Sequence, residues 1–284
     1  MAKKNLGEMS FLDHLEELRW LLVRSTIAIC IMAFFTYFIS DYLFDQIILG
    51  PIRPTFFTYV WFCDLSHALG FADSICITEL NFIIQNTEME GQVNIFVWMC
   101  LLAGFILSFP FILWELWKFI SPALYEKERK NAKVFIFTSS LLFFLGVLFG
   151  YFVVIPMSVN FVATFSVSDV VKNQFTLESY MGMVKTSILA SGLFFELPII
   201  IYFLTKLGLV TPDFLRKYWK YAVVIILIVA AIVTPPDVVS QTIVAIPMLI
   251  IYEVSILISK HQPLLTGIDY IPDHFPRSYL GYAY

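Results

Sequence analysis

The chain has 284 residues, of which 59% are hydrophobic and only 14% are charged, and its mean hydropathy is +0.81. Soluble domains carry about 25% charged residues, and a soluble fold of this composition would expose large apolar patches to water. The composition therefore indicates a membrane protein, and the net charge of −4 excludes the basic surface that nucleic acid requires.

Six apolar segments are candidates for membrane spans, since a spanning helix needs about 20 apolar residues to cross a hydrocarbon core about 30 Å thick. The expected spans are 20–40, 91–114, 134–157, 177–204, 221–234 and 238–258. No small-residue cleavage site follows the first, so we expect it to be a retained span rather than a signal peptide. The sequence thus predicts an all-α integral membrane protein with six transmembrane helices.

The fifth expected span, 221–234, is short. At about 1.5 Å per residue it covers about 21 Å, so we expect the membrane to thin locally around it. Pro235 and Pro236 separate it from the sixth span, which suits a tight turn because proline cannot continue a helix. A re-entrant hairpin made of both segments is the alternative.

The distribution of lysine and arginine predicts the orientation, because these residues concentrate in cytoplasmic segments. With six spans, the N-terminal segment, the loops 118–133 and 206–220 and the C-terminal tail share one side and hold 15 of the 18 basic residues. The other side holds only Arg53, Lys172 and Lys185. We therefore expect cytoplasmic N and C termini.

The segment before the first span predicts a short amphipathic helix, 1–19, on the cytoplasmic surface, followed by a membrane domain, 20–258, and a cytoplasmic tail, 259–284. The helix has an apolar face and an acidic face at helical spacing: Phe11, Leu12, Leu15 and Leu18 against Asp13, Glu16 and Glu17. Interfacial helices usually carry basic residues on the polar face. Acidic residues there favour a basic partner, and a merely solvated face is the alternative.

Four motifs follow one another along the chain: His14-Leu-Glu-Glu-Leu-Arg19, Phe119-Ile-Ser-Pro-Ala-Leu-Tyr125 with Glu128-Arg129, Phe195-Glu-Leu-Pro198, and Thr234-Pro-Pro-Asp-Val238 with Ser240-Gln241. Together they resemble TatC, the multispanning receptor of the twin-arginine protein translocase, over about residues 10–258. The resemblance implies a concave bundle with short fifth and sixth helices in the bacterial cytoplasmic (inner) membrane. It also implies a function as the core subunit that binds twin-arginine signal peptides of folded proteins and assembles with TatA/TatB-type partners for export driven by the proton gradient.

The resemblance assigns signal-peptide binding to Glu17, Glu128, Glu16, Arg19, Phe119 and Tyr125. A guanidinium offers a fork of donors that a carboxylate accepts at two points, whereas a lysine ammonium has no such fork. Glu17 and Glu128 could each hold one arginine, and Glu16 could share the role of Glu17. The alternative for Glu128 is pairing with neighbouring bases on the surface, worth at most about 1 kcal/mol. Many TatC proteins carry a second arginine two positions after the one that matches Arg19, where this chain has Leu21.

Glu196 lies inside the fourth expected span, where a carboxylate is costly and is a functional candidate by default. The resemblance places it in an intramembrane polar groove that contacts partner or cargo helices, and a satisfied structural hydrogen bond is the alternative. Pro198 breaks the helical hydrogen-bond ladder nearby. Lys185 lies 11 residues earlier, about 16 Å along the axis, and we expect it to extend toward the outer surface.

Thr234, Asp237 and Gln241 cluster at the turn between the last two spans, where TatC proteins dock single-span partners. We expect Gln241 and Asp237 to hydrogen-bond such a partner, although Asp237 also suits the N-cap of the sixth helix. In the long loop 41–90, Cys63 and Cys76 could form a disulfide in an oxidising periplasm, or remain free. Cys30 and Cys100 fall in apolar runs, and no cysteine or histidine has metal-ligand spacing.

The competing function is a secondary transporter or channel with Glu196 as an ion site, but inverted repeats are not evident. No Walker, HExxH or GxSxG motif is present, so we expect a non-enzyme without cofactors. The expected partners are signal peptides, TatA/TatB-type proteins, the lipid bilayer and further copies of the chain.

Overall fold

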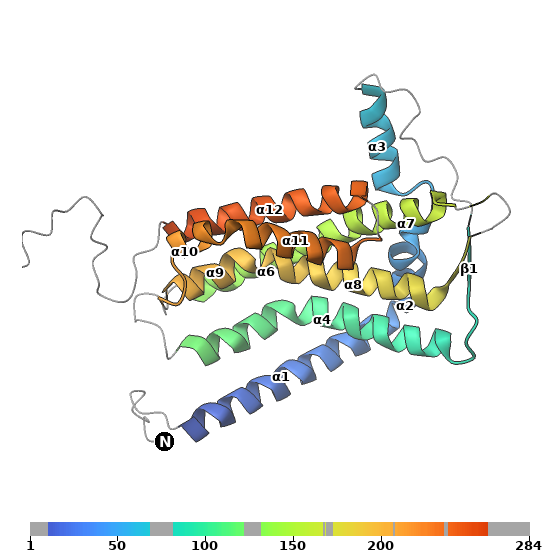
Figure 1. The fold of residues 1–284 in the computed structure, drawn as a ribbon. Coiled ribbons are helices and arrows are strands. Elements are labelled where there is room, and N and C mark those ends of the chain that lie inside the picture. The colour runs from blue at the N-terminus through green and yellow to red at the C-terminus, as the bar shows by residue number, and fades with distance from the viewer. Residues whose placement is uncertain are drawn as a thin grey trace, which may run out of the picture.

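Long helices that run side by side make up the computed structural model of the chain (Figure 1). The structure describes residues 11–68, 82–121, 132–166, 168, 173–206, 208–235 and 238–260. Its main helices are α1 (Phe11–Phe38), α4 (Gly91–Ile120), α6 (Ala132–Phe149), α7 (Ile155–Thr164), α8 (Leu177–Phe195), α9 (Leu197–Lys206), α11 (Trp219–Val233) and α12 (Val238–Lys260). A π-helical segment, η5 (Gly150–Val154), joins α6 to α7.

Five of the helical stretches within the described residues are long and apolar enough to cross a membrane: His14–Phe38, Gly91–Ile120, Ala132–Thr164, Leu177–Lys206 and Ser240–Lys260. The apolar helix α11 has 15 residues and covers about 22 Å at about 1.5 Å per residue. It is therefore too short to be counted with the five by length alone.

Helices α1, α4 and α12 differ most clearly from the sequence expectation. Helix α1 is continuous from Phe11 to Phe38, with no break at the expected boundary between residues 19 and 20. Helix α4 continues past Trp114 to Ile120, because glutamate, leucine and lysine favour the helical backbone even where the apolar run ends. The expectation of a short sixth helix is wrong: α12 has 23 residues and runs through Pro247.

The two ends of the bundle differ in structure (Figure 1). Helix α1 begins at one end, which we call the N-terminal end, and α4, α9 and α12 finish there beside the short helix α10 (Pro212–Lys217). The opposite end carries short elements: α2 (Ser40–Tyr42), η1 (Leu43–Ile48), η2 (Gly50–Ile52), α3 (Phe57–Ala68), β1 (Ile83–Gln85) and β2 (Gln174–Thr176).

Strand pairing and buried hydrogen bonds hold that opposite end together. Strands β1 and β2 pair in parallel, with Ile84 opposite Phe175. Helix α3 is fixed at its start, where the Thr58 hydroxyl donates to the Phe152 carbonyl at 2.6 Å and the buried Tyr59 hydroxyl donates to the Pro51 carbonyl at 2.9 Å. Burial raises the pKa of the Tyr59 phenol, so it remains a neutral donor.

Small residues let the central helices approach closely, as is common at helix contacts in membranes. A Cβ on Gly146 of α6 would lie 2.6 Å from the Ser191 carbonyl oxygen of α8. Likewise, a Cβ on Gly104 of α4 would lie 2.6 Å from the Ala33 backbone nitrogen of α1. Both contacts leave room for no larger side chain unless the helices move apart.

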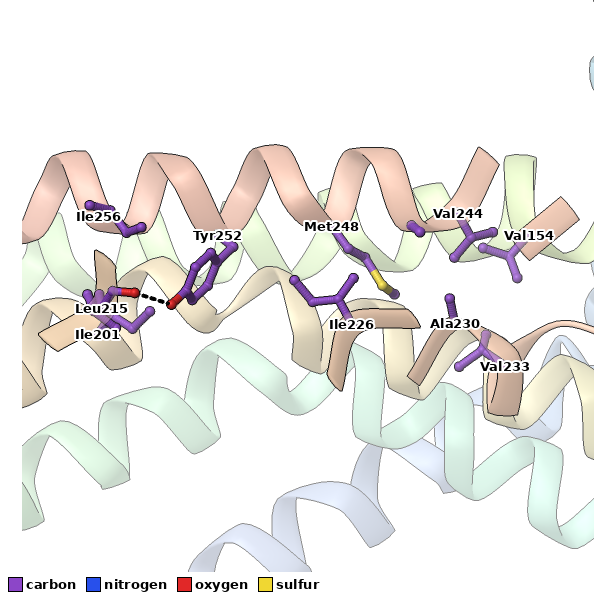
Figure 2. Packing of buried hydrophobic residues seen from close by; sticks show 11 residues of the cluster. Val154, Ile201, Leu215, Ile226, Ala230, Val233, Val244, Met248, Tyr252 and Ile256 are labelled. Carbon is purple, nitrogen blue, oxygen red and sulfur yellow. Dashed lines mark hydrogen bonds between the residues drawn. The ribbon is translucent and has the colours of Figure 1, made fainter. Parts of the chain in front are cut away.

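The last two helices pack against the rest of the bundle through one apolar cluster (Figure 2). Met248 and Val244 of α12 and Ala230 of α11 are buried in it. The Tyr252 hydroxyl crosses from α12 and donates to the Leu215 carbonyl of α10 at 3.1 Å. This packing fixes α11 and α12 beside α8 and α9.

Candidate functional site

Helices α1 and α4 meet closely in the middle of the bundle and enclose a cavity at the N-terminal end. They are joined by the Thr36 hydroxyl, which lies 3.2 Å from the Cys100 carbonyl oxygen, and by the close approach at Gly104. Figure 1 shows the two helices diverging toward the N-terminal end. The cavity there has a volume of about 270 Å³ and is lined by Glu17, Trp20, Leu21, Arg24, Glu115, Lys118 and Phe119. We call it the α1–α4 cavity.

A buried carboxylate lies between two basic side chains in this cavity. Glu115 is only 4% exposed, and its Oε2 accepts from Arg24 Nη1 at 3.2 Å while its Oε1 accepts from Lys118 Nζ at 2.5 Å. Arg24 and Lys118 are each about half exposed. Because an unpaired buried charge is strongly unfavourable, the two cations allow Glu115 to remain ionised at this depth.

Both cations also lie near the faces of tryptophan rings. The Arg24 guanidinium carbon is 6.0 Å from the Trp20 ring centroid, and Lys118 Nζ is 5.6 Å from that of Trp114. Contacts of this kind attract a cation to the ring face. Each basic side chain therefore has a second favourable contact besides the one to Glu115.

Two of the sequence motifs meet beside the cavity. The imidazole of His14 stacks on the ring of Phe119, with centroids 4.3 Å apart and planes inclined by 18°. One turn after His14, the exposed Glu17 lines the cavity from α1. The structure thus brings the predicted residues Glu17 and Phe119 to one place.

The remaining predicted signal-peptide residues have other positions. Glu16 and Arg19 are exposed on α1 and are not among the residues that line the cavity. Glu128 and Tyr125 fall outside the described residues. That Glu17 and Glu128 each bind one arginine of the signal peptide therefore stays a prediction.

Sequence reasoning alone does not identify Glu115 as a site residue, because the second expected span ends at Trp114, where charged residues begin. An acidic residue between two tryptophans in an apolar helix was the available signal. Its partner Arg24 lies 91 positions away, and sequence spacing alone does not reveal such a pair.

A second polar site surrounds Glu196, which is 6% exposed and lies at the break between α8 and α9. The break follows from Pro198, which lacks an N–H and whose ring clashes with the carbonyl four residues earlier. The Ser139 hydroxyl of α6 donates to Glu196 Oε2. Within the described part of the chain, Glu196 Oε1 and the buried Ser140 hydroxyl have no hydrogen-bond partner.

The predicted docking residues make intramolecular contacts. The buried Thr234 hydroxyl donates to the Ala230 carbonyl at 2.9 Å. Gln241 Nε2 donates to the Leu227 carbonyl at 3.0 Å and so ties α12 to α11. Asp237 is outside the described residues. Lys185 Nζ lies 5.7 Å from the Trp98 ring centroid, which links α8 to α4.

The cysteines in the described part of the chain differ in their bonding. Cys63 of α3 is disulfide-bonded, whereas Cys30 and Cys100 are free. Cys76 lies outside the described residues, so its pairing with Cys63 stays a prediction. Over the described ranges, no group of three histidine, cysteine, aspartate or glutamate residues is placed to hold a metal ion.

Known proteins resemble this chain over most of its length. The family model for "Sec-independent protein translocase protein (TatC)" matches residues 13–247. TatC of Blattabacterium sp. subsp. Periplaneta americana (strain BPLAN) is 43% identical over 258 residues, covering 90% of this chain and 97% of the relative. TatCy of Bacillus subtilis (strain 168) is 34% identical over 260 residues, with 92% of each chain covered.

Solved structures agree with these sequence relatives. A crystal structure of the twin arginine translocase receptor TatC superimposes with a TM-score of 0.67 at 31% identity, covering 87% of this chain and 98% of that chain. A TatC receptor structure in DDM gives a TM-score of 0.69 at 31% identity, with 87% and 99% covered. The chain therefore belongs to the TatC family and is a core subunit of the Tat protein translocase, a multi-pass membrane component of protein transport.

Proposed function

We propose that this chain is the receptor for twin-arginine signal peptides at the cytoplasmic face of the bacterial inner membrane. The observation that carries the proposal is the α1–α4 cavity, in which Glu17 and Phe119, residues of two separate TatC motifs, line one space. An arginine side chain entering there meets the carboxylate of Glu17 and the ring faces of Trp20 and Phe119. Carboxylates and aromatic faces are both favourable partners for a guanidinium.

An apolar groove between the same two helices adjoins the cavity at Arg24. This groove, of about 420 Å³, shares Arg24 with the cavity and is otherwise lined by Ile27, Ala28, Ile31, Met32, Leu107, Ser108 and Phe111. A twin-arginine signal peptide has the matching order, with arginines followed by an apolar stretch. The arginines would occupy the α1–α4 cavity while the apolar stretch follows the groove into the membrane.

The proposal includes six spans with both termini in the cytoplasm, arranged as the surface segment 1–19, the membrane domain 20–258 and the tail 259–284. The five long apolar stretches and α11 make up the six. Lys118, Lys206 and Lys260 come at the ends of helices that finish at the N-terminal end of the bundle. Basic residues at that end support its placement in the cytoplasm. The short α11 fits if the membrane thins around it.

TatA/TatB-type single-span proteins and further copies of the chain complete the proposed assembly for export driven by the proton gradient. Helices α11 and α12 are the proposed docking surface, with Thr234, Asp237 and Gln241 at their turn. Glu196 supports a role in contacting partner or cargo helices, because one of its buried oxygens has no hydrogen-bond partner among the described residues. Polar groups at membrane depth usually face the interior of a bundle or a functional partner.

The test is a titration of the purified full chain with a fluorescent twin-arginine peptide and with its Arg-Arg→Lys-Lys form. We expect the arginine peptide to bind more tightly, and Glu17→Ala and Glu128→Ala each to weaken it by about tenfold or more. Glu178→Ala, which removes an exposed acid at the far end of α8, is the control and should bind normally. Equal binding of both peptides would contradict the proposed receptor function. Solute uptake by proteoliposomes that contain this chain alone would favour a transporter.

A further inference from the structure

We propose that Glu115 is an additional carboxylate of the signal-peptide site, which binds a guanidinium of the incoming peptide and is occupied by Arg24 and Lys118 while the receptor is empty. The inference rests on the proposed receptor function and adds a specificity-determining residue to it. Glu115 lies on the same cavity as Glu17, and neither cation that holds it is itself buried.

Glu115 is placed to act as the inner carboxylate of the cavity. Its side chain is 5% exposed, whereas Glu17 is exposed, so an entering side chain passes Glu17 before it reaches Glu115. A carboxylate has about four acceptor positions on its two oxygens. The contacts to Arg24 and Lys118 use one on each oxygen, which leaves acceptor capacity for a guest donor.

The two intramolecular cations can give way to a guest. Lys118 follows Glu115 by three residues on the same helix and reaches it from a half-exposed position. Its ammonium also lies 5.6 Å from the Trp114 ring centroid, so it keeps a favourable contact when it leaves the carboxylate. An arriving guanidinium would replace a single ammonium contact with two parallel hydrogen bonds.

This exchange also explains why arginine would be preferred over lysine. A lysine of the peptide would replace the ammonium of Lys118 with an equivalent ammonium and gain no hydrogen bond. An arginine gains the bidentate geometry, and its guanidinium is more weakly hydrated, so it loses less on entering a partly buried site. The buried position of Glu115 makes this difference larger than it is at an exposed carboxylate.

The alternative is that the Arg24–Glu115–Lys118 group only braces α1 against α4. The two possibilities predict opposite signs for the substitution Lys118→Met. If Lys118 competes with the peptide for Glu115, its removal raises the affinity for the twin-arginine peptide. If Lys118 is only a brace, its removal leaves the affinity unchanged or lowers it. Because Lys118 is half exposed, the variant should fold.

The experiment measures binding of labelled Arg-Arg and Lys-Lys peptides to the full chain carrying Glu115→Gln, Lys118→Met or neither substitution. We expect Glu115→Gln to weaken the Arg-Arg complex by about tenfold and Lys118→Met to tighten it several-fold. Lys185→Met is the matched control, because Lys185 lies over Trp98 as Lys118 lies over Trp114 but outside the cavity, and it should change neither affinity.

The possible failures are separable. If the unsubstituted chain binds both peptides equally, the receptor function itself fails. If it prefers the arginine peptide and Glu17→Ala weakens binding, but Lys118→Met does not tighten it, the role of Glu115 is overturned while the receptor function stands. If Glu115→Gln leaves the affinity for the Arg-Arg peptide unchanged, the role of Glu115 is likewise overturned while the receptor function stands.

Discussion

The ring of His14 on α1 stacks on the ring of Phe119 on α4, with centroids 4.3 Å apart. The two residues belong to different TatC motifs and are separated by more than a hundred positions in the chain. Phe119 lines the α1–α4 cavity together with Glu17, which follows His14 by about one turn of α1. The stack therefore joins α1 to α4 directly beside the proposed peptide site.

Phe119→Ala should weaken binding of the twin-arginine peptide, because an aromatic pair contributes about 0.5–1.5 kcal/mol beyond its buried area. His14→Phe keeps a stacked pair and should retain most of the affinity, whereas His14→Ala should resemble Phe119→Ala. Fluorescence titration of the three variants checks this. Equal affinities for all of them would show that the stack does not position the site.

Gly146→Ala should destabilise the bundle, because the added Cβ would lie 2.6 Å from the Ser191 carbonyl oxygen and overpacking costs about 1–3 kcal/mol. Gly182→Ala is the matched control on α8, where an added Cβ meets no atom within 4 Å. Thermal unfolding in detergent should show a lower midpoint for Gly146→Ala and an unchanged or higher one for Gly182→Ala. The reverse order would contradict the close α6–α8 packing.

Ser139→Ala should lower stability by about 1–3 kcal/mol, because it removes the hydrogen bond to the buried Glu196 carboxyl and leaves that acceptor unsatisfied. Ser140→Ala is the neighbouring control, since the Ser140 hydroxyl is buried and has no partner within the described residues. It should be nearly neutral. Chemical unfolding of both variants in detergent tests the difference, and equal losses would count against the Ser139–Glu196 contact.

Mass spectrometry of protein from the native membrane, digested without reductant, should find a Cys63 peptide joined to a Cys76 peptide. Cys63 is disulfide-bonded in the structure. A bridge from Cys63 to Cys76 would close a short loop, and in the chain-entropy model this stabilises a fold by about 3 kcal/mol. Reduction should accordingly lower the unfolding midpoint. Alkylation of both residues without prior reduction would disprove the bridge.

Apolar length in the sequence predicts where most long helices lie, because every spanning segment must bury its backbone polar groups in helical hydrogen bonds. The expected spans 91–114 and 134–157 fall inside α4 and the continuous stretch from α6 to α7. Helix ends are harder to predict. The α4 ladder continues through Glu115 and Lys118 because glutamate and lysine are good helix formers, a property that hydropathy does not measure.

The candidate site was predictable only in part, because some of its residues gain their position from partners on other helices. Glu17 and Phe119 belong to recognisable motifs, whereas Glu115 gains its position from Arg24, a residue of another helix. Likewise, Ser139 in α6 carries no sequence signal, and its importance comes from facing Glu196 across the α6–α8 contact. Long-range polar pairs of this kind depend on the tertiary fold.

The most direct test of the central claim is the coupling free energy between Glu17 of the receptor and an arginine of the signal peptide. Binding is measured for both receptors, unsubstituted and Glu17→Gln, with peptides that carry arginine or glutamine at each of the two positions. If Glu17 holds one of the arginines, the coupling free energy at that peptide position is at least about 1 kcal/mol. If the losses of binding free energy from the receptor substitution and from each peptide substitution are additive to within about 0.3–0.5 kcal/mol at both positions, Glu17 does not contact the arginines.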